Sequence, residues 1–183
     1  MTSDNSDTRA AGDPAAGAGG LSHVRADGSS HMVDVTDKSV TTREATAEAT
    51  LVTRADVIEK IMTGDLPKGE ALSVARVAGI MAAKRTSELV PLCHPLPITK
   101  VSVDFAPTGT DAITVTAQVR TTGRTGVEME ALTAASIAAV TLFDMIKAVD
   151  HLAVIQQTRV LAKSGGKSGD WSRTPENEET PRP

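Results

Sequence analysis

Aromatic residues are scarce in this sequence, with no tyrosine and an aromatic content of only 2% over 183 residues. Proteins that bind single-stranded nucleic acid stack the bases on aromatic rings. Proteins that bind the phosphate backbone carry an excess of positive charge. This chain instead has a net charge of −4. Few rings and a negative balance together argue against a nucleic-acid partner.

Cysteine is almost absent too. Cys93 is the single cysteine in the sequence, so an internal disulfide is excluded. The N-terminal residues lack the apolar run of a secretion signal, so we expect a cytoplasmic protein. Cys93 stands beside His94, but no second pair of ligands follows at a zinc-type spacing. We therefore expect no bound metal, and nothing in the sequence indicates a cofactor.

The two ends of the chain differ in composition from its middle. Residues 1–30 are rich in Gly, Ala, Ser, Asp and Thr, so we expect a disordered N-terminal tail, and residues 172–183 are expected to form a second one. Residues 31–171 are expected to form a single domain. Residues 32–171 hold 15 Lys or Arg and 16 Asp or Glu, so a cationic site would have to come from local clustering of lysines.

The middle of the chain is dominated by one apolar segment. Apolar residues recur every three or four positions and predict a long helix over residues 127–149, with Thr125 and Glu128 as a capping box at its start. The stretch from Ala131 to Phe143 carries no charge, so we expect burial nearly all round. It is too short and too rich in Thr and Ser to predict a membrane span. Asp144 and Lys147, three residues apart, follow it as surface neighbours.

The other periodic segments predict an α+β protein. Strands are expected over residues 44–53 and 152–162, a hairpin over 98–105 and 112–121, and helices over 54–63 and 71–90. The order β-α-α-β-β-α-β contains the split β-α-β unit of ferredoxin-like folds. We therefore predict an antiparallel sheet with helices packed on it.

Several residues outside the long helix allow more than one interpretation. Three prolines stiffen the loop around Cys93 and His94, where His94 is either a proton-handling or phosphate-contacting group or a buried structural histidine. A nucleophilic Cys93 is a further possibility. Lys68 lies in an exposed loop, and Lys84 can complement the dipole of a helix end. The glycine-rich residues 163–170 offer amides and lysines to phosphate, or form a flexible exit.

Six segments, taken together and in order, resemble the cyclic pyranopterin monophosphate synthase family, the molybdenum cofactor biosynthesis protein C family. They are His31–Val35, Ala82–Thr86, Pro91–Leu96, Thr125–Ala135, Asp144–Val149 and Leu161–Asp170. The resemblance implies a lyase that converts a cyclised dihydro-GTP to cyclic pyranopterin monophosphate and diphosphate in molybdenum cofactor biosynthesis. It also implies a ferredoxin-like fold and a homohexamer built as a trimer of dimers.

The resemblance also assigns site residues. It implies that Asp144 and Lys147 are catalytic, with either one as the acid or the base. The substrate-binding residues that it implies are Leu92, Cys93, His94, Met129, Glu130, Lys68, Lys84 and Lys163. Dispersed lysines suit a triphosphate substrate whose leaving diphosphate must be stabilised.

The spacing of two of these residues adds a prediction. Glu130 and Asp144 are fourteen positions apart on one helix, which separates them by about 21 Å. They cannot flank one reacting atom, so we expect either a long cleft or sites shared between subunits, and the alanine-rich helix surface favours the second. Two other classes of protein fit parts of the sequence. A non-catalytic nucleotide-sensing ferredoxin-like module would explain the fold and the lysines, and a scaffolding protein only the alanine-rich helix.

Overall fold

The computed structural model describes residues 27–174, so most of the two expected tails lies outside the described residues. The chain divides into a unit up to Val33 and a unit from Asp34 onward. Of the first unit the structure describes residues 27–33, in which the Asp27 carboxylate accepts hydrogen bonds from the amide and hydroxyl of Ser29. All that follows concerns the second unit.

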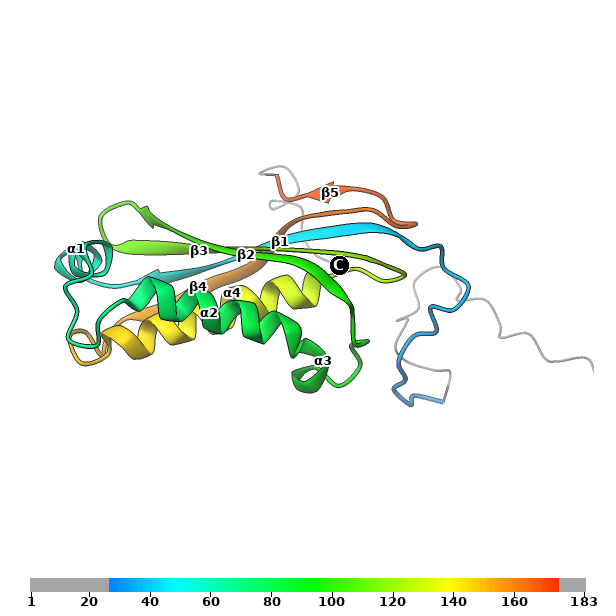
Figure 1. Cartoon of the computed structure of the whole chain (residues 1–183), viewed down its shortest axis with the longest axis horizontal. Helices are drawn as coiled ribbons and strands as arrows, with labels where there is room; N and C mark the ends of the chain where they lie inside the picture. The colour runs from blue at the N-terminus through cyan, green and yellow to red at the C-terminus, as the bar shows by residue number, and fades with distance from the viewer. Residues whose placement is uncertain (1–26, 175–183) are drawn as a thin grey trace, which may run out of the picture. The chain divides into compact units, whose positions relative to one another are not determined.

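The described residues alternate strands and helices in the predicted order, with one extra helix and one extra strand. The elements are β1 Thr41–Val52, α1 Ala55–Thr63, α2 Ala71–Lys84, α3 Thr86–Leu89, β2 Ile98–Thr108, β3 Ala112–Gly123, α4 Glu128–Ile146, β4 Val154–Ser164 and β5 Trp171–Ser172 (Figure 1). Ser172 was expected in the C-terminal tail. It lies in β5 because Arg173 continues the pairing through a hydrogen bond from its amide to the Leu161 carbonyl.

The strands of the described region form one antiparallel sheet in the order β2-β3-β1-β4-β5. The first four are arranged as the ferredoxin-like prediction requires, with β1 at the centre. Thr41 pairs with Gly123 and Val52 with Ala112, so β1 ends where the β2–β3 hairpin turns. The β1–β4 register shifts twice, and Gln157 takes a φ of 54° within this irregular pairing.

Helices α2 and α4 lie side by side on one face of the sheet (Figure 1). Their contact is close because Gly79 of α2 faces the backbone of Ala134 and the side chain of Ala138. Ala83, near the end of α2, belongs to the apolar cluster around the start of α4, whereas Ala71 and Ala75 belong to the cluster around its end. The two helices are therefore antiparallel.

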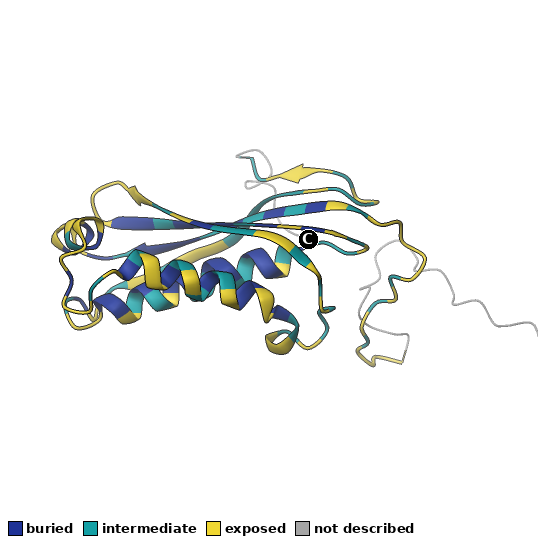
Figure 2. Ribbon diagram, viewed as in Figure 1, coloured by how far each residue is buried: buried dark blue, intermediate teal, exposed yellow. Residues whose placement is uncertain are grey.

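Burial follows this layering (Figure 2). The helix side of the sheet is apolar and inaccessible, with Ala45, Ala47 and Ala49 of β1 almost fully buried. Helix α4 is long and apolar enough to cross a membrane by length and composition, and half of that apolar window is buried inside the protein. Its burial is less complete than the sequence predicted, which was burial nearly all round, because Val140 is 51% exposed.

Two local predictions were wrong. The expected helix over residues 71–90 is broken at Arg85, because the Thr86 hydroxyl hydrogen-bonds the Ala83 carbonyl and the chain restarts as α3. The expected capping box is not formed. Val127 is the N-cap of α4, and the Glu128 carboxylate binds Lys163 instead of closing a box with Thr125.

Candidate active site

Asp144 lies in the last turn of α4 with its carboxylate between two ammonium groups. Lys147, three residues on, binds one carboxylate oxygen at 2.7 Å, and Lys68 binds the other at 2.8 Å. Lys68 also donates to the Asp144 main-chain carbonyl at 2.7 Å. The predicted pair of Asp144 and Lys147 is therefore confirmed as a contact. We call Asp144, Lys147 and Lys68 the C-terminal cluster.

The two ammonium groups control the charge of Asp144. Hydrogen bonds from Lys147 and then from Lys68 lower the pKa of Asp144 from 3.8 to about 2. The side chain is about half exposed, at 52%. Asp144 is therefore an ionised, accessible carboxylate at neutral pH, and it can accept a hydrogen bond from a bound molecule.

Glu130 lies at the opposite end of α4 and has the opposite environment. It is only 3% exposed, and its burial raises its pKa from 4.5 to about 6, with a smaller contribution from the nearby charge of Glu128. Burial also raises the pKa of the Cys93 thiol, and the charge of Glu130 raises it further. A thiol with a raised pKa is a poor nucleophile at neutral pH, which disfavours the nucleophilic interpretation of Cys93.

Cys93 and Met129 connect the remaining substrate-binding candidates to Glu130, the first through its charge and the second as its chain neighbour. Leu92, Cys93 and His94 form a half-buried run in the loop after α3, and Met129 is 39% exposed beside Glu130. Asp34 accepts a hydrogen bond from the Thr36 amide at 2.8 Å, which is the bond of a local turn. Two hydrogen bonds involving Thr36 lower the pKa of Asp34, and the charge of His94 lowers it further, so His94 lies near this carboxylate.

Two of the predicted site lysines belong to this same end of the helix pair. Lys163 in β4 contacts the Glu128 carboxylate at 3.1 Å and the Ser168 hydroxyl at 3.3 Å. Lys84 is the exposed last residue of α2, and α2 runs antiparallel to α4, so it lies toward the start of α4. We call this region the N-terminal cluster; its members are Lys84, Leu92, Cys93, His94, Met129, Glu130 and Lys163.

The structure thus divides the predicted site residues between the two ends of one helix. Glu130 and Asp144 both lie in the unbroken helix α4, so about 21 Å of helix separates them. Lys68 joins Asp144 although 76 residues separate them in the sequence. No metal-binding group of three or more His, Cys, Asp or Glu occurs within residues 27–174.

Sequence reasoning missed the residues that anchor the turn after α4. Thr53 and Arg54, which follow β1, hydrogen-bond the turn after α4 through Asp150 and Val149. These contacts left only a weak sign in the sequence. Asp150 directly follows the apolar helix, and an aspartate at such a position often closes a turn. Its partner Thr53 stands 97 residues away.

Comparison with known proteins gives one consistent result. The model of the MoaC family matches residues 32–166. A cyclic pyranopterin monophosphate synthase of Corynebacterium efficiens is 64% identical over 152 residues, which cover 83% of this chain and 97% of that protein. Cyclic pyranopterin monophosphate synthase 2 of Mycobacterium tuberculosis is 60% identical over 85% of this chain and 92% of its own length. The synthase of Chloroflexus aurantiacus is 56% identical over 84% and 94%.

Proposed function

This chain belongs to the MoaC family, and we propose that it catalyses the reaction for which its relatives are named, the formation of cyclic pyranopterin monophosphate. The substrate is a small nucleotide, (8S)-3′,8-cyclo-7,8-dihydroguanosine 5′-triphosphate. It is rearranged with release of diphosphate, so the enzyme is a lyase of molybdenum cofactor biosynthesis. The observation that carries the proposal is the ionised Asp144 carboxylate between Lys147 and Lys68 within the matched region.

We assign the proton transfers of the reaction to Asp144 and Lys147. Asp144 remains ionised at neutral pH, which suits a partner for developing positive charge. With a pKa of about 2 it is a weak base while both lysines bind it, and loss of one lysine to a bound substrate would strengthen it as a proton acceptor. Lys147 contacts it as an ammonium and is the matching donor. Both side chains are about half exposed, so a bound substrate can reach them.

The phosphates need cations. Lys68, Lys84 and Lys163 supply ammonium groups, and charge on the departing diphosphate grows in the transition state, where fixed cations stabilise it most. Lys68 holds Asp144 in the free protein. A polyanionic substrate competes for that lysine, so binding would loosen the carboxylate for its role as acceptor.

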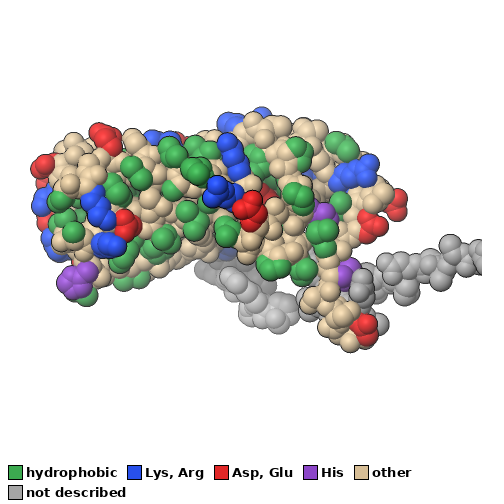
Figure 3. Space-filling model, turned by 60° about the horizontal axis from the view of Figure 1, so that its bottom comes forward, with side chains coloured by type: hydrophobic (Ala, Val, Ile, Leu, Met, Phe, Trp, Pro, Cys, Tyr) green, Lys and Arg blue, Asp and Glu red, His purple; other side chains and the backbone are tan. Residues whose placement is uncertain are grey.

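We further propose that each site joins the C-terminal cluster of one subunit to the N-terminal cluster of another. The separation of about 21 Å between Glu130 and Asp144 along α4 supports this arrangement. So does the apolar surface of the helix layer (Figure 3), where Val74, Val77 and Met81 of α2 are each about half exposed. A homohexamer built as a trimer of dimers would cover such surfaces. A cytoplasmic location remains a prediction.

The reaction itself is the test. Purified protein incubated with the cyclised dihydro-GTP should release diphosphate and yield a pterin product. Asp144→Asn and Lys147→Ala should each abolish turnover with circular dichroism and oligomeric state unchanged. Asp104→Asn, which removes an exposed carboxylate of β2, is the matched control and should turn over normally. A nucleotide-sensing module would bind the substrate without releasing diphosphate, and that result would refute the proposal.

A further inference from the structure

Helix α4 does not end freely in solvent after Asp144 and Lys147. The Lys147 amide donates to the Phe143 carbonyl at 2.9 Å, and the amides of Val149 and Asp150 both donate to the Ile146 carbonyl. These bonds satisfy carbonyls that a helix end otherwise leaves open. The turn over residues 147–150 is therefore a direct continuation of the helix end that carries the reactive groups.

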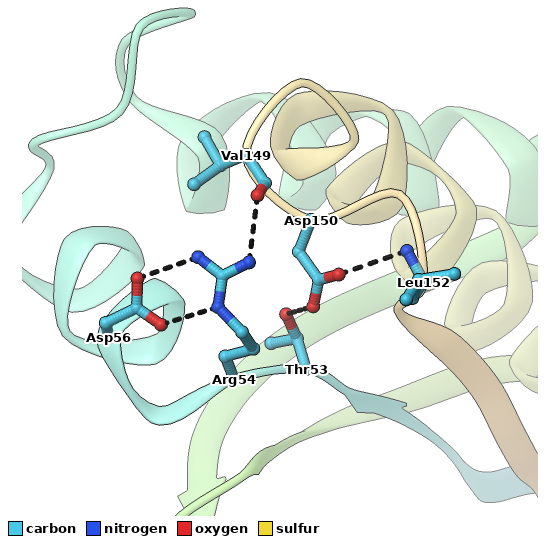
Figure 4. Close-up of polar contacts among 6 residues, drawn as sticks. All are labelled: Thr53, Arg54, Asp56, Val149, Asp150 and Leu152. Carbon is cyan, nitrogen blue, oxygen red and sulfur yellow. Dashed lines mark hydrogen bonds and ion pairs between the residues drawn. The ribbon is translucent and has the colours of Figure 1, made fainter.

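The carboxylate of Asp150 anchors this turn to the rest of the protein (Figure 4). One of its oxygens accepts the Thr53 hydroxyl at 2.7 Å, and the other accepts the Leu152 amide at 3.0 Å. Asp150 and Thr53 are 6% and 5% exposed. A charged hydrogen bond between buried groups is stronger than one in solvent, so this bond can hold the turn in place.

Thr53 is itself fixed to the centre of the sheet. It follows β1, the central strand, and its amide donates to the Asp111 carbonyl in the β2–β3 turn at 2.8 Å. The next residue, Arg54, adds a second connection, because its guanidinium donates to the Val149 carbonyl at 3.1 Å and forms two bonds to Asp56 (Figure 4). Two consecutive residues thus hold two consecutive residues of the turn.

The C-terminal cluster cannot supply this rigidity by itself. The side chains of Asp144 and Lys147 are 52% and 53% exposed, and that of Lys68 is 38% exposed. Exposed ion pairs are weak and compete with water and salt. Catalysis needs the reacting groups held in place, and a displacement of about 1 Å can cost about 100-fold in rate.

We propose that Thr53, Asp150 and Arg54 are positioning residues that hold Lys147 and Asp144 in their reactive geometry by tying the end of α4 to the central strand. The proposal rests on the proposed function of the C-terminal cluster. These residues act through the helix end and do not need to touch the substrate.

The test separates positioning from binding and from stability. Thr53→Val keeps the shape of the side chain but removes the hydroxyl, so kcat should fall about 10- to 100-fold while KM stays within about twofold. Thr53→Ser restores the hydroxyl and should recover most of kcat. Arg54→Met removes the exposed hydrogen bond to the Val149 carbonyl. It leaves the buried bond between Thr53 and Asp150 in place, so the variant should fold normally and lower kcat by a smaller factor.

Two controls are matched to these variants. Thr141→Val makes the same substitution on α4, where the hydroxyl bonds only the Ile137 carbonyl of its own helix, and should keep the normal kcat. Ile113→Val lowers stability in the core at the same end of the sheet and should also keep it. Wild-type kcat in both Thr53→Val and Arg54→Met would overturn the proposal, as would a loss confined to KM or one that Thr53→Ser fails to reverse. A wild-type protein that released no diphosphate would overturn the proposed function, and this proposal with it.

Discussion

At the level of single residues, Glu130 and Asp144 are carboxylates of the same helix, α4, with opposite properties. Asp144 is half exposed and bound by two lysines, and its pKa falls to about 2, whereas Glu130 is buried and its pKa rises to about 6. Charge partners favour ionisation and desolvation opposes it, so the environment rather than the residue type decides. Two acids whose environments push their pKa values apart in this way commonly serve different roles in one reaction.

Lys68→Met tests the control of Asp144. The variant removes one of the two hydrogen bonds that lower the pKa of Asp144, and Lys147 keeps the other, so the pKa should rise above about 2 but stay below 3.8. Carbon-13 NMR of labelled aspartate carboxyl groups would follow the titration. Lys100→Met on β2 is the control and should not move the Asp144 signal. An unchanged Asp144 titration in Lys68→Met would show that Lys147 alone determines it.

Burial of Glu130 should make stability depend on pH. The pKa of Glu130 is higher in the folded than in the unfolded protein, so between pH 4.5 and about pH 6 the folded state binds more protons. The free energy of unfolding therefore falls as the pH rises through that window. The loss from pH 4.5 to pH 7 is about 1–2 kcal/mol. Glu130→Gln should remove this pH dependence of the unfolding free energy, as measured by urea unfolding at fixed protein concentration. Glu88→Gln, an exposed change on α3, should preserve it.

At the level of elements, the periodicity of apolar residues predicted those helices and strands whose formation depends on the local sequence. The apolar repeat predicted α4 and the alternating residues predicted the hairpin, because burial of one face dictates both patterns. The break at Arg85 was not predictable, since Ala82, Ala83 and Lys84 all favour helix and the interruption depends on a hydroxyl bonding back to a carbonyl. Spacing likewise predicted the contact of Lys147 with Asp144. It could not predict Lys68 or Thr53, which reach the helix end through the fold.

Gly79→Ala tests the close approach of α2 to α4. A methyl group at this position would lie 2.9 Å from the Ala134 carbonyl oxygen and 3.1 Å from the Ala138 side chain. Alanine favours a helix by about 1 kcal/mol over glycine, but the overpacking costs about 1–3 kcal/mol. We expect a net loss of about 1 kcal/mol in unfolding free energy. Ser73→Ala, on the exposed side of α2, should change it by less than about 0.5 kcal/mol. A stabilised Gly79→Ala protein would contradict the close packing.

At the level of the whole molecule, the candidate site residues fall into two separate clusters, and we propose that subunits of an assembly bring them together. The clusters lie at opposite ends of α4, and the helix layer between them exposes Val77 and Val140 to more than half of their surface. An apolar surface of this kind lowers its free energy when another copy covers it. A symmetric contact can then bring the end of one α4 near the start of another.

Mixing two inactive variants tests this arrangement. Asp144→Asn damages the C-terminal cluster and Glu130→Gln the N-terminal cluster, so each protein alone should be inactive. If every site takes one cluster from each of two subunits, random exchange in an equal mixture leaves about a quarter of the sites intact, and about a quarter of the wild-type activity should return. Mixing Asp144→Asn with Lys147→Ala is the control, since both changes damage the same cluster and no intact site can form. Native mass spectrometry would establish that subunits exchanged. Exchange without recovered activity would mean that each chain carries its whole site, and the substrate would then have to extend along α4.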